Sequence, residues 1–124
     1  MLTVTFNDHT QSVVSVEQLG GLLDQFNSTD QFELWLSIET GPSVCMLRNG
    51  KNAFLMYLRF SADSGFVSQA EESKPGSASY VLSNGQVDEY PLAWCVNVEQ
   101  CYKVLAYFFV NDGAKPDWIS WYES

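Results

Sequence analysis

The chain has 124 residues, of which 46% are hydrophobic and 15% aromatic, which suits one folded domain and excludes a disordered chain. Fifteen acidic residues against six scattered basic residues give a formal net charge of -9. This balance argues against direct binding of nucleic acid, which needs clustered Lys and Arg. The sequence has neither a signal-peptide pattern nor an apolar run of membrane-spanning length, so we expect a cytoplasmic protein without membrane contact.

The first third of the chain predicts a strand, a helix and a second strand. Residues 2–6 alternate apolar side chains with Thr, as in a short strand. Ser15 and Gln18 form a capping-box pattern, and apolar residues then recur at helical spacing as far as Phe26. We expect Gly20 and Gly21, which weaken a helix, to allow close packing of this helix on a sheet. Residues 32–39 alternate with period two, which predicts a strand with one dry face.

The middle of the chain predicts a hairpin followed by a polar loop. The apolar runs 43–48 and 53–60 flank the turn-forming residues 49–52, which begin with Asn-Gly. The second run is apolar on both faces, so we expect it to be the central strand. Residues 61–77 are rich in Ser, Glu, Gly and Pro, which predicts a loop, with the pattern of a short strand only at 65–67.

The last third predicts a second hairpin, a helix and a closing strand. Residues 80–82 and 86–90 flank an Asn-Gly turn, and 92–96 fit one more short strand. Asn97 and Gln100 form a second cap pattern, before an apolar stripe that runs from Cys101 to Phe108. Asn-Asp-Gly at 111–113 ends that helix, and 118–122 alternate as a last strand. The order predicts one α+β domain over residues 1–124, a mainly antiparallel twisted sheet with two helices packed on it.

The residues that carry chemistry in enzymes form no recognisable pattern here. The one histidine, His9, stands near a predicted turn, and no zinc-ligand spacing, phosphate loop or nucleophile elbow is present. The three cysteines, Cys45, Cys95 and Cys101, make no CxxC pair and favour buried free thiols. We therefore expect no enzyme, no cofactor and no metal. An enzyme with paired carboxylates, such as a pair from the acids at 71–72 and 88–89, stays an alternative that requires those acids to converge.

The acidic residues are concentrated in the segment 61–99, which holds six acids and one base, a net charge of -5. Acids beside exposed aromatic residues are typical of a protein interface, because aromatics anchor and carboxylates steer a basic partner. The same aromatics can equally be core residues, since every second strand position is buried. The predicted binding residues are Asp63, Phe66, Glu71, Glu72, Tyr80, Asp88, Glu89 and Tyr90.

The order of elements resembles a family of bacterial polymorphic-toxin immunity proteins, the first-numbered immunity family. The resemblance rests on the capped first helix, the Phe-Glu-Leu-Trp-Leu strand at 32–36, the hairpin ending in 52–60, the Asn-Gly turn at 84–85, the helix at 98–109 and the closing segment 115–123. It implies tight binding to a cognate toxin domain and occlusion of its active site. Members include antidotes of deaminase toxins that act on DNA, so the resemblance implies a basic, nucleic-acid-acting deaminase as partner. Trp118 and Trp121 in the closing segment are expected in the core.

The alternative function is a small-molecule-binding or regulatory α+β module. Such a module requires a pocket between the sheet and the helices, and we expect Trp35, Tyr57 and Trp94 to line it.

Overall fold

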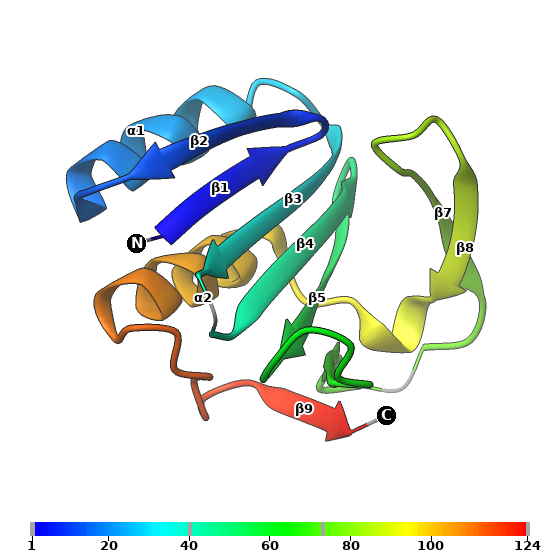
Figure 1. Ribbon diagram of the computed structural model, residues 1–124. Coiled ribbons are helices and arrows are strands. Elements are labelled where there is room, and N and C mark those ends of the chain that lie inside the picture. Colours follow the sequence, from blue (N-terminus) through cyan, green and yellow to red (C-terminus); the bar gives the residue numbers. More distant parts are fainter. Residues whose placement is uncertain (1, 40, 73, 124) are drawn as a thin grey trace.

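The computed structural model describes residues 2–39, 41–72 and 74–123, and within them the chain forms nine strands, two α-helices and one short 3₁₀ helix (Figure 1). The strands are β1 (Leu2–Phe6), β2 (His9–Val13), β3 (Gln31–Ile38), β4 (Ser43–Asn49), β5 (Asn52–Leu58), β6 (Phe66–Gln69), β7 (Ser77–Val81), β8 (Val87–Pro91) and β9 (Ser120–Glu123). The helices are α1 (Val16–Phe26), the 3₁₀ helix η1 (Leu92–Trp94) and α2 (Val98–Val110).

Seven of the described strands form one antiparallel sheet in the order β2-β1-β3-β4-β5-β6-β9, while β7 and β8 pair only with each other. This architecture confirms the predicted α+β class. The central strand is β4, and its residues 44–47 are buried on both faces. The expectation that β5 is the central strand was wrong by one position. Three strands lie on each side of β4, whereas only β6 and β9 lie beyond β5.

Both α-helices begin where the cap patterns predict. At α1 the Gln18 amide donates to Ser15 Oγ over 3.1 Å. The Gln18 side chain reaches back one residue beyond the cap, where Oε1 accepts from the Val14 amide over 2.9 Å. At α2 the Gln100 amide donates to Asn97 Oδ1 over 2.8 Å. Each cap satisfies backbone donors that a helix start otherwise leaves unpaired, so the local sequence fixes where each helix enters the fold.

The two α-helices pack on the same face of the sheet, behind the strands in Figure 1. Their apolar stripes meet every second residue of β1, β3, β4 and β5 in the main core. From the helices this core takes Leu19, Leu23, Phe26, Cys101, Val104, Leu105 and Phe108. Gly20 and Gly21 have no part in it: they lie on the exposed side of α1, and a Cβ added at either would meet nothing within 4 Å. The expectation of close packing through these glycines was wrong.

The β7–β8 hairpin packs on part of the other face of the sheet, where it forms a second, smaller core. Cys45, Leu47, Phe54 and Tyr80 are buried there, and the ring of Phe54 contacts Tyr80 edge-on with centroids 5.1 Å apart. Polar links also hold the hairpin in place, because Asn49 Nδ2 donates to the Ser79 carbonyl over 2.7 Å. The hairpin therefore stands against the sheet through side chains, without joining its strand ladder.

Three further details differ from the sequence predictions. The predicted strand at 92–96 is instead a 3₁₀ turn, η1, in which the Cys95 amide donates to the Leu92 carbonyl. These described residues therefore form no strand. Strand β2 was not predicted, because its residues are exposed and polar apart from Val13 and carry no alternation. Trp118 is 46% exposed, so its expected place in the core was wrong, whereas Trp121 does pack against the main core.

Candidate functional site

The eight predicted binding residues do not form one surface; the structure places them in three separate regions. Asp63 and Phe66 lie at the turn between β5 and β6 and at the start of β6. Glu71 and Glu72 follow β6 and line a groove. The remaining four lie on the β7–β8 hairpin. Each region has its own electrostatic character.

The first region is a compensated charge cluster. The Asp63 carboxylate accepts hydrogen bonds from Nε and Nη2 of Arg59 over 2.8 and 2.9 Å and a third from the Arg59 amide. These bonds hold the pKa of Asp63 well below its ordinary value of 3.8. The Phe66 ring lies under two cations, with Lys115 Nζ 4.2 Å and the Arg59 guanidinium 5.2 Å from its centroid. Asp63 and Phe66 therefore bind within the molecule and offer no net negative charge.

In the hairpin, the two predicted tyrosines serve mainly to hold it on the sheet. Tyr80 is 0% exposed, and its hydroxyl lies 3.3 Å from Cys95 Sγ. Burial raises the pKa of Tyr80, so it stays a neutral phenol. Tyr90 is half-buried and stacks on Trp94 with centroids 5.6 Å apart.

The two hairpin carboxylates point to opposite sides, because Asp88 and Glu89 are successive residues of β8. Asp88 lies opposite Tyr80 on the side that faces the large sheet, and it accepts a bond from Gln86 Nε2 over 2.8 Å. Glu89 lies opposite Ser79 on the outer side and is exposed. Of these two hairpin carboxylates, only Asp88 therefore adds negative charge to the space between the hairpin and the sheet.

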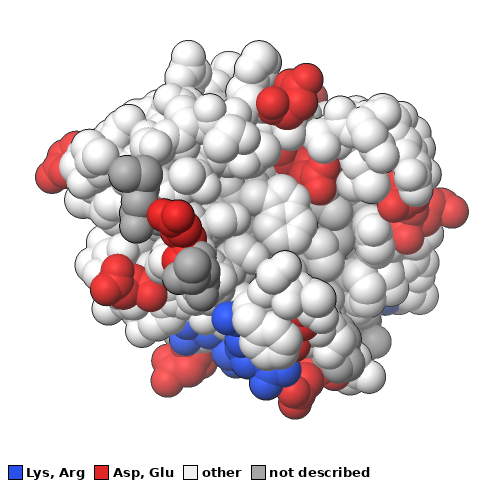
Figure 2. All heavy atoms as spheres, in the orientation of Figure 1, with Lys and Arg blue, Asp and Glu red and all other residues white. Residues whose placement is uncertain are grey.

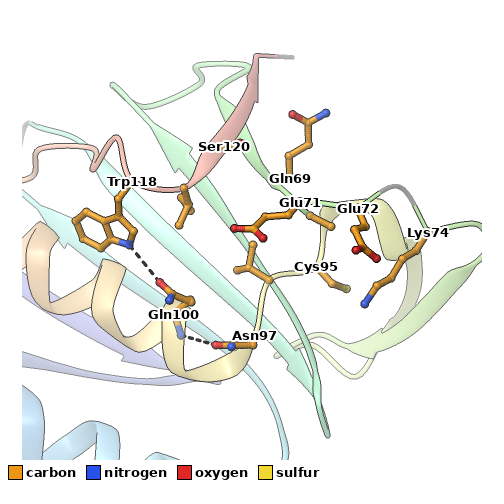
Figure 3. A pocket seen from close by; sticks show the side chains of 12 residues that line it. Gln69, Glu71, Glu72, Lys74, Cys95, Asn97, Gln100, Trp118 and Ser120 are labelled. Atoms are coloured by element: carbon orange, nitrogen blue, oxygen red, sulfur yellow. Dashed lines mark hydrogen bonds between the residues drawn. The ribbon is translucent and has the colours of Figure 1, made fainter.

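A groove of about 390 Å³ runs between the end of β6 and the start of α2 (Figure 3). Trp118 stands at one end, held by a bond from Nε1 to Gln100 Oε1 over 3.2 Å, and the carboxylates of Glu71 and Glu72 lie further along. Both glutamates are exposed, and in the described residues neither makes an ion pair, although Lys74 also lines the groove. We call this feature the β6–α2 groove.

The second accessible feature is the face of the large sheet that the α-helices do not cover. Along each strand, residues that point to this face alternate with residues that point into the main core. Because paired residues of neighbouring strands lie side by side, the outward residues form rows across the sheet. One row consists of Thr5, Trp35, Cys45, Met56, Val67 and Tyr122. We call the part beside the hairpin, on β1, β3 and β4, the open face. Figure 2 shows it with a largely uncharged centre over β3 and β4, with acidic side chains spaced around it and with a cluster of basic side chains at the lower edge of the view.

Trp35 and Glu33 form a fixed pair on the open face. Trp35 Nε1 donates to Glu33 Oε2 over 3.0 Å, and the Ser83 amide of the hairpin loop donates to Glu33 Oε1 over 2.9 Å. Partial burial raises the pKa of Glu33, but these hydrogen bonds outweigh it and leave the pKa below its ordinary value of 4.5. Glu33 is therefore ionised at neutral pH and orients the indole.

Glu33 was not among the candidate residues of the sequence analysis, and Trp35 was named there only for the pocket of the small-molecule alternative. Their signal was present, since both occupy the outward positions of the alternating segment 32–39. A tryptophan at an outward strand position is unusual on a solvated surface and marks a second contact, here with the hairpin.

The pocket required by the small-molecule alternative does not form. Trp35 and Trp94 pack with the second core, whereas Tyr57 belongs to the main core on the opposite face of the sheet. The three rings therefore cannot line one cavity. Among the described residues, no group of three or more His, Cys, Asp or Glu side chains gathers in a way that could hold a metal ion.

The thiols Cys45 and Cys101 are buried and unbridged, as predicted, and Cys95 is half-buried. Burial raises the pKa of the Cys45 and Cys101 thiols, which keeps both neutral. In the described part of the chain, no helix is long and apolar enough to cross a membrane.

Fold and surface together define a small α+β domain with two accessible features, the β6–α2 groove and the open face. A family model described as immunity protein Imm1 matches residues 6–123. The chain therefore belongs to the Imm1 family of immunity proteins, and its partner is a cognate toxin. A comparison with curated proteins finds no match.

Proposed function

We propose that this immunity protein neutralises its toxin by binding the catalytic domain and covering the active site, and that the toxin is a nucleic-acid-acting deaminase. The observation that carries the proposal is the family match over residues 6–123 together with the net charge of -9. The immunity protein itself performs no reaction in this mechanism; it acts as a plug.

The charge of the chain fits a toxin that binds nucleic acid. Such an enzyme needs a basic cleft to hold phosphates, and an acidic protein can occupy that cleft with carboxylates. Glu71, Glu72 and Glu89 are exposed and make no ion pair in the described residues, so their charges are available to a basic partner. Their field attracts a basic partner before contact, which speeds association.

A deaminase fits the occlusion mechanism, because it must draw its target base out into a deep zinc pocket. Any protein that covers the mouth of this pocket stops the reaction without touching the zinc. The resemblance of the capped helices and the closing segment to antidotes of DNA-directed deaminases supports this choice.

The test uses the cognate toxin domain, which we expect at the C-terminus of a protein encoded immediately upstream of this chain. Expression of that domain alone should arrest growth, and co-expression of the immunity protein should restore it through a one-to-one complex. In vitro, deamination of cytosine in DNA should fall linearly to zero at equimolar immunity protein. Growth arrest that persists on co-expression overturns neutralisation, whereas protection from a domain that deaminates no nucleic acid overturns only the deaminase assignment.

A further inference from the structure

The open face is left uncovered by the way the layers are arranged. Both α-helices pack on one face of the seven-stranded sheet, and the β7–β8 hairpin covers only the part of the other face that includes Leu47 and Phe54 (Figure 1). Next to the hairpin, the same face continues across β4, β3 and β1, and no further layer of residues 2–39, 41–72 or 74–123 covers it.

The composition of the open face is that of an interface centre. Apart from Glu33, the outward residues beside Trp35 on the open face are small and neutral, and their side chains are half-buried. They are Thr3, Thr5, Ser37 and Ser43. Figure 2 shows few charged side chains over β3 and β4, and most of the charged side chains in this view lie around that region. A neutral centre inside a charged rim is the usual anatomy of a protein–protein interface.

The anchor on this face is already ordered. The Trp35 indole is half-buried and fixed by its bond to Glu33, so little rotamer freedom remains to be lost on binding. Tryptophan is enriched among residues that dominate binding energy, especially where it is pre-oriented near the centre of an interface.

Negative charge lies at one border of the open face, at the root of the hairpin. Glu33 is ionised there, and Asp88 faces the same space from β8. The two carboxylates are close enough to act together on Tyr90, whose pKa is raised by burial and by both charges. A partner that meets this border must therefore present Arg or Lys.

We infer that the open face is the docking surface for the toxin, with Trp35 at its centre and with Glu33 and Asp88 receiving basic side chains from the toxin's substrate cleft. This inference rests on the proposed function, because it takes the basic toxin domain as the occupant. It moves the main contact away from the β6–α2 groove, whose acids then act at a distance.

The first experiment places charge on the open face without touching the core. The double variant Thr5→Lys, Ser37→Lys adds two cations beside Trp35, and the matched variant Gln25→Lys, Val110→Lys adds two cations at exposed positions of the α-helices. Affinity for the upstream-encoded toxin domain should fall by at least about a hundredfold in the first variant, because like charges are buried against a basic cleft, and by less than about threefold in the second. Equal affinities of the two variants overturn the inference.

The second experiment needs no substitution. With ¹³C-methyl methionine, the half-buried Met56 reports on the hairpin side of the sheet, because it lies in the same row as Trp35 and packs against the second core at the border of the open face. Met46 is fully buried under the α-helices and serves as the internal reference. Toxin binding should shift the Met56 signal more than the Met46 signal, and the reverse order contradicts the inference. If the wild-type chain protects cells but neither experiment locates the toxin on the open face, the proposed function stands and this surface is wrong. If the wild-type chain does not protect, the proposed function itself fails.

Discussion

The hydroxyl of Tyr57 donates a hydrogen bond of 2.5 Å to the carbonyl oxygen of Gly113, and this bond joins two segments far apart in the sequence. Tyr57 lies on β5, and Gly113 lies in the loop that follows α2 with a φ of +88°. A Cβ at Gly113 would come within 2.6 Å of Pro42 and 2.7 Å of Ile38. The loop can approach the sheet closely enough to be held by Tyr57 only because this residue is glycine.

Removing the Tyr57 hydroxyl should destabilise the fold. In Tyr57→Phe the Gly113 carbonyl loses its buried donor, which should lower the free energy of unfolding by about 1–3 kcal/mol. Denaturant unfolding measures this change. Tyr107→Phe is the matched control, since its hydroxyl makes no hydrogen bond among the described residues, and it should change stability by less than about 0.5 kcal/mol. Equal effects of the two substitutions would show that the Tyr57 bond contributes nothing.

Alanine at Gly20 and Gly21 should stabilise the protein. Both glycines lie in α1 with open space around them, so each alanine should add about 0.5–1 kcal/mol through backbone entropy and helix propensity. Toxin affinity should stay unchanged, because α1 lies on the face opposite the open face. Gly65→Ala is the control with the opposite sign: its φ is +74°, and a Cβ would lie 2.6 Å from the Tyr57 carbonyl oxygen. A thermal melt that shows no gain for the double alanine variant contradicts this prediction.

Asp63 should make stability depend on pH in the acidic range. The Arg59 hydrogen bonds lower the pKa of Asp63 in the folded state, so its contribution to stability is fully present above the unfolded pKa. This contribution is lost as the pH falls below about 4, the ordinary pKa of an aspartate. Asp63→Asn should therefore be less stable than wild type at pH 7, and the difference should shrink toward pH 2.

The matched control for this pH experiment is Asp24→Asn, which removes an exposed carboxylate from α1. Its stability difference from wild type should stay small across the same pH range. Denaturant unfolding midpoints of both variants and of wild type are measured at several pH values. If the stability difference between Asp63→Asn and wild type does not vary with pH, the role assigned to Arg59 is refuted.

The two hairpin acids should differ in their effect on toxin binding. Asp88→Lys reverses a charge on the side that faces the sheet, and it should weaken binding by about tenfold or more. Glu89→Lys makes the same change on the outer side and should weaken it by less than about threefold. Isothermal titration compares the two, with melting temperatures to verify that the hairpin remains folded. A larger loss from Glu89→Lys would place the contact on the other side of the hairpin.

The groove acids should influence the rate of association and not the lifetime of the complex. Glu71→Lys together with Glu72→Lys should slow association by about tenfold at low ionic strength, and the effect should vanish in high salt. The control Glu17→Lys with Asp24→Lys changes the net charge equally on α1 and should slow association less. Stopped-flow kinetics separates the two rates, and a faster dissociation of the groove variant would indicate direct contact instead.

Much of the scaffold could be predicted from the sequence because local signals agree with the fold. Ser15 and Asn97 start the α-helices where the cap patterns place them, and residues 49–52 form the predicted hairpin turn, with Gly50 at a φ of +61°. Strand β2 escaped prediction because an exposed edge strand has no buried face to impose alternation on its residues.

The candidate site was harder to predict, because it depends on contacts between distant segments. The sequence marks Asp63 as acidic but does not show that Arg59 neutralises it. It marks Tyr80 as aromatic, but only the docking of the hairpin determines that this ring is buried and that Asp88 and Glu89 face opposite sides. Which face of the sheet the α-helices leave uncovered is likewise a property of the assembled layers.

In the described residues, β7 and β8 pair only with each other, so the part of the chain at the border of the open face is separate from the seven-stranded sheet that forms the scaffold. Within the described residues, β7 and β8 meet the large sheet through side chains such as Asn49 and Tyr80, so the register of the seven strands does not depend on them. Substitutions or changes of length at the hairpin tip can therefore alter the border of the open face while the strand pairing of the large sheet is preserved. A change in the toxin could then be met by a change at this border, with the seven-stranded sheet left as it is.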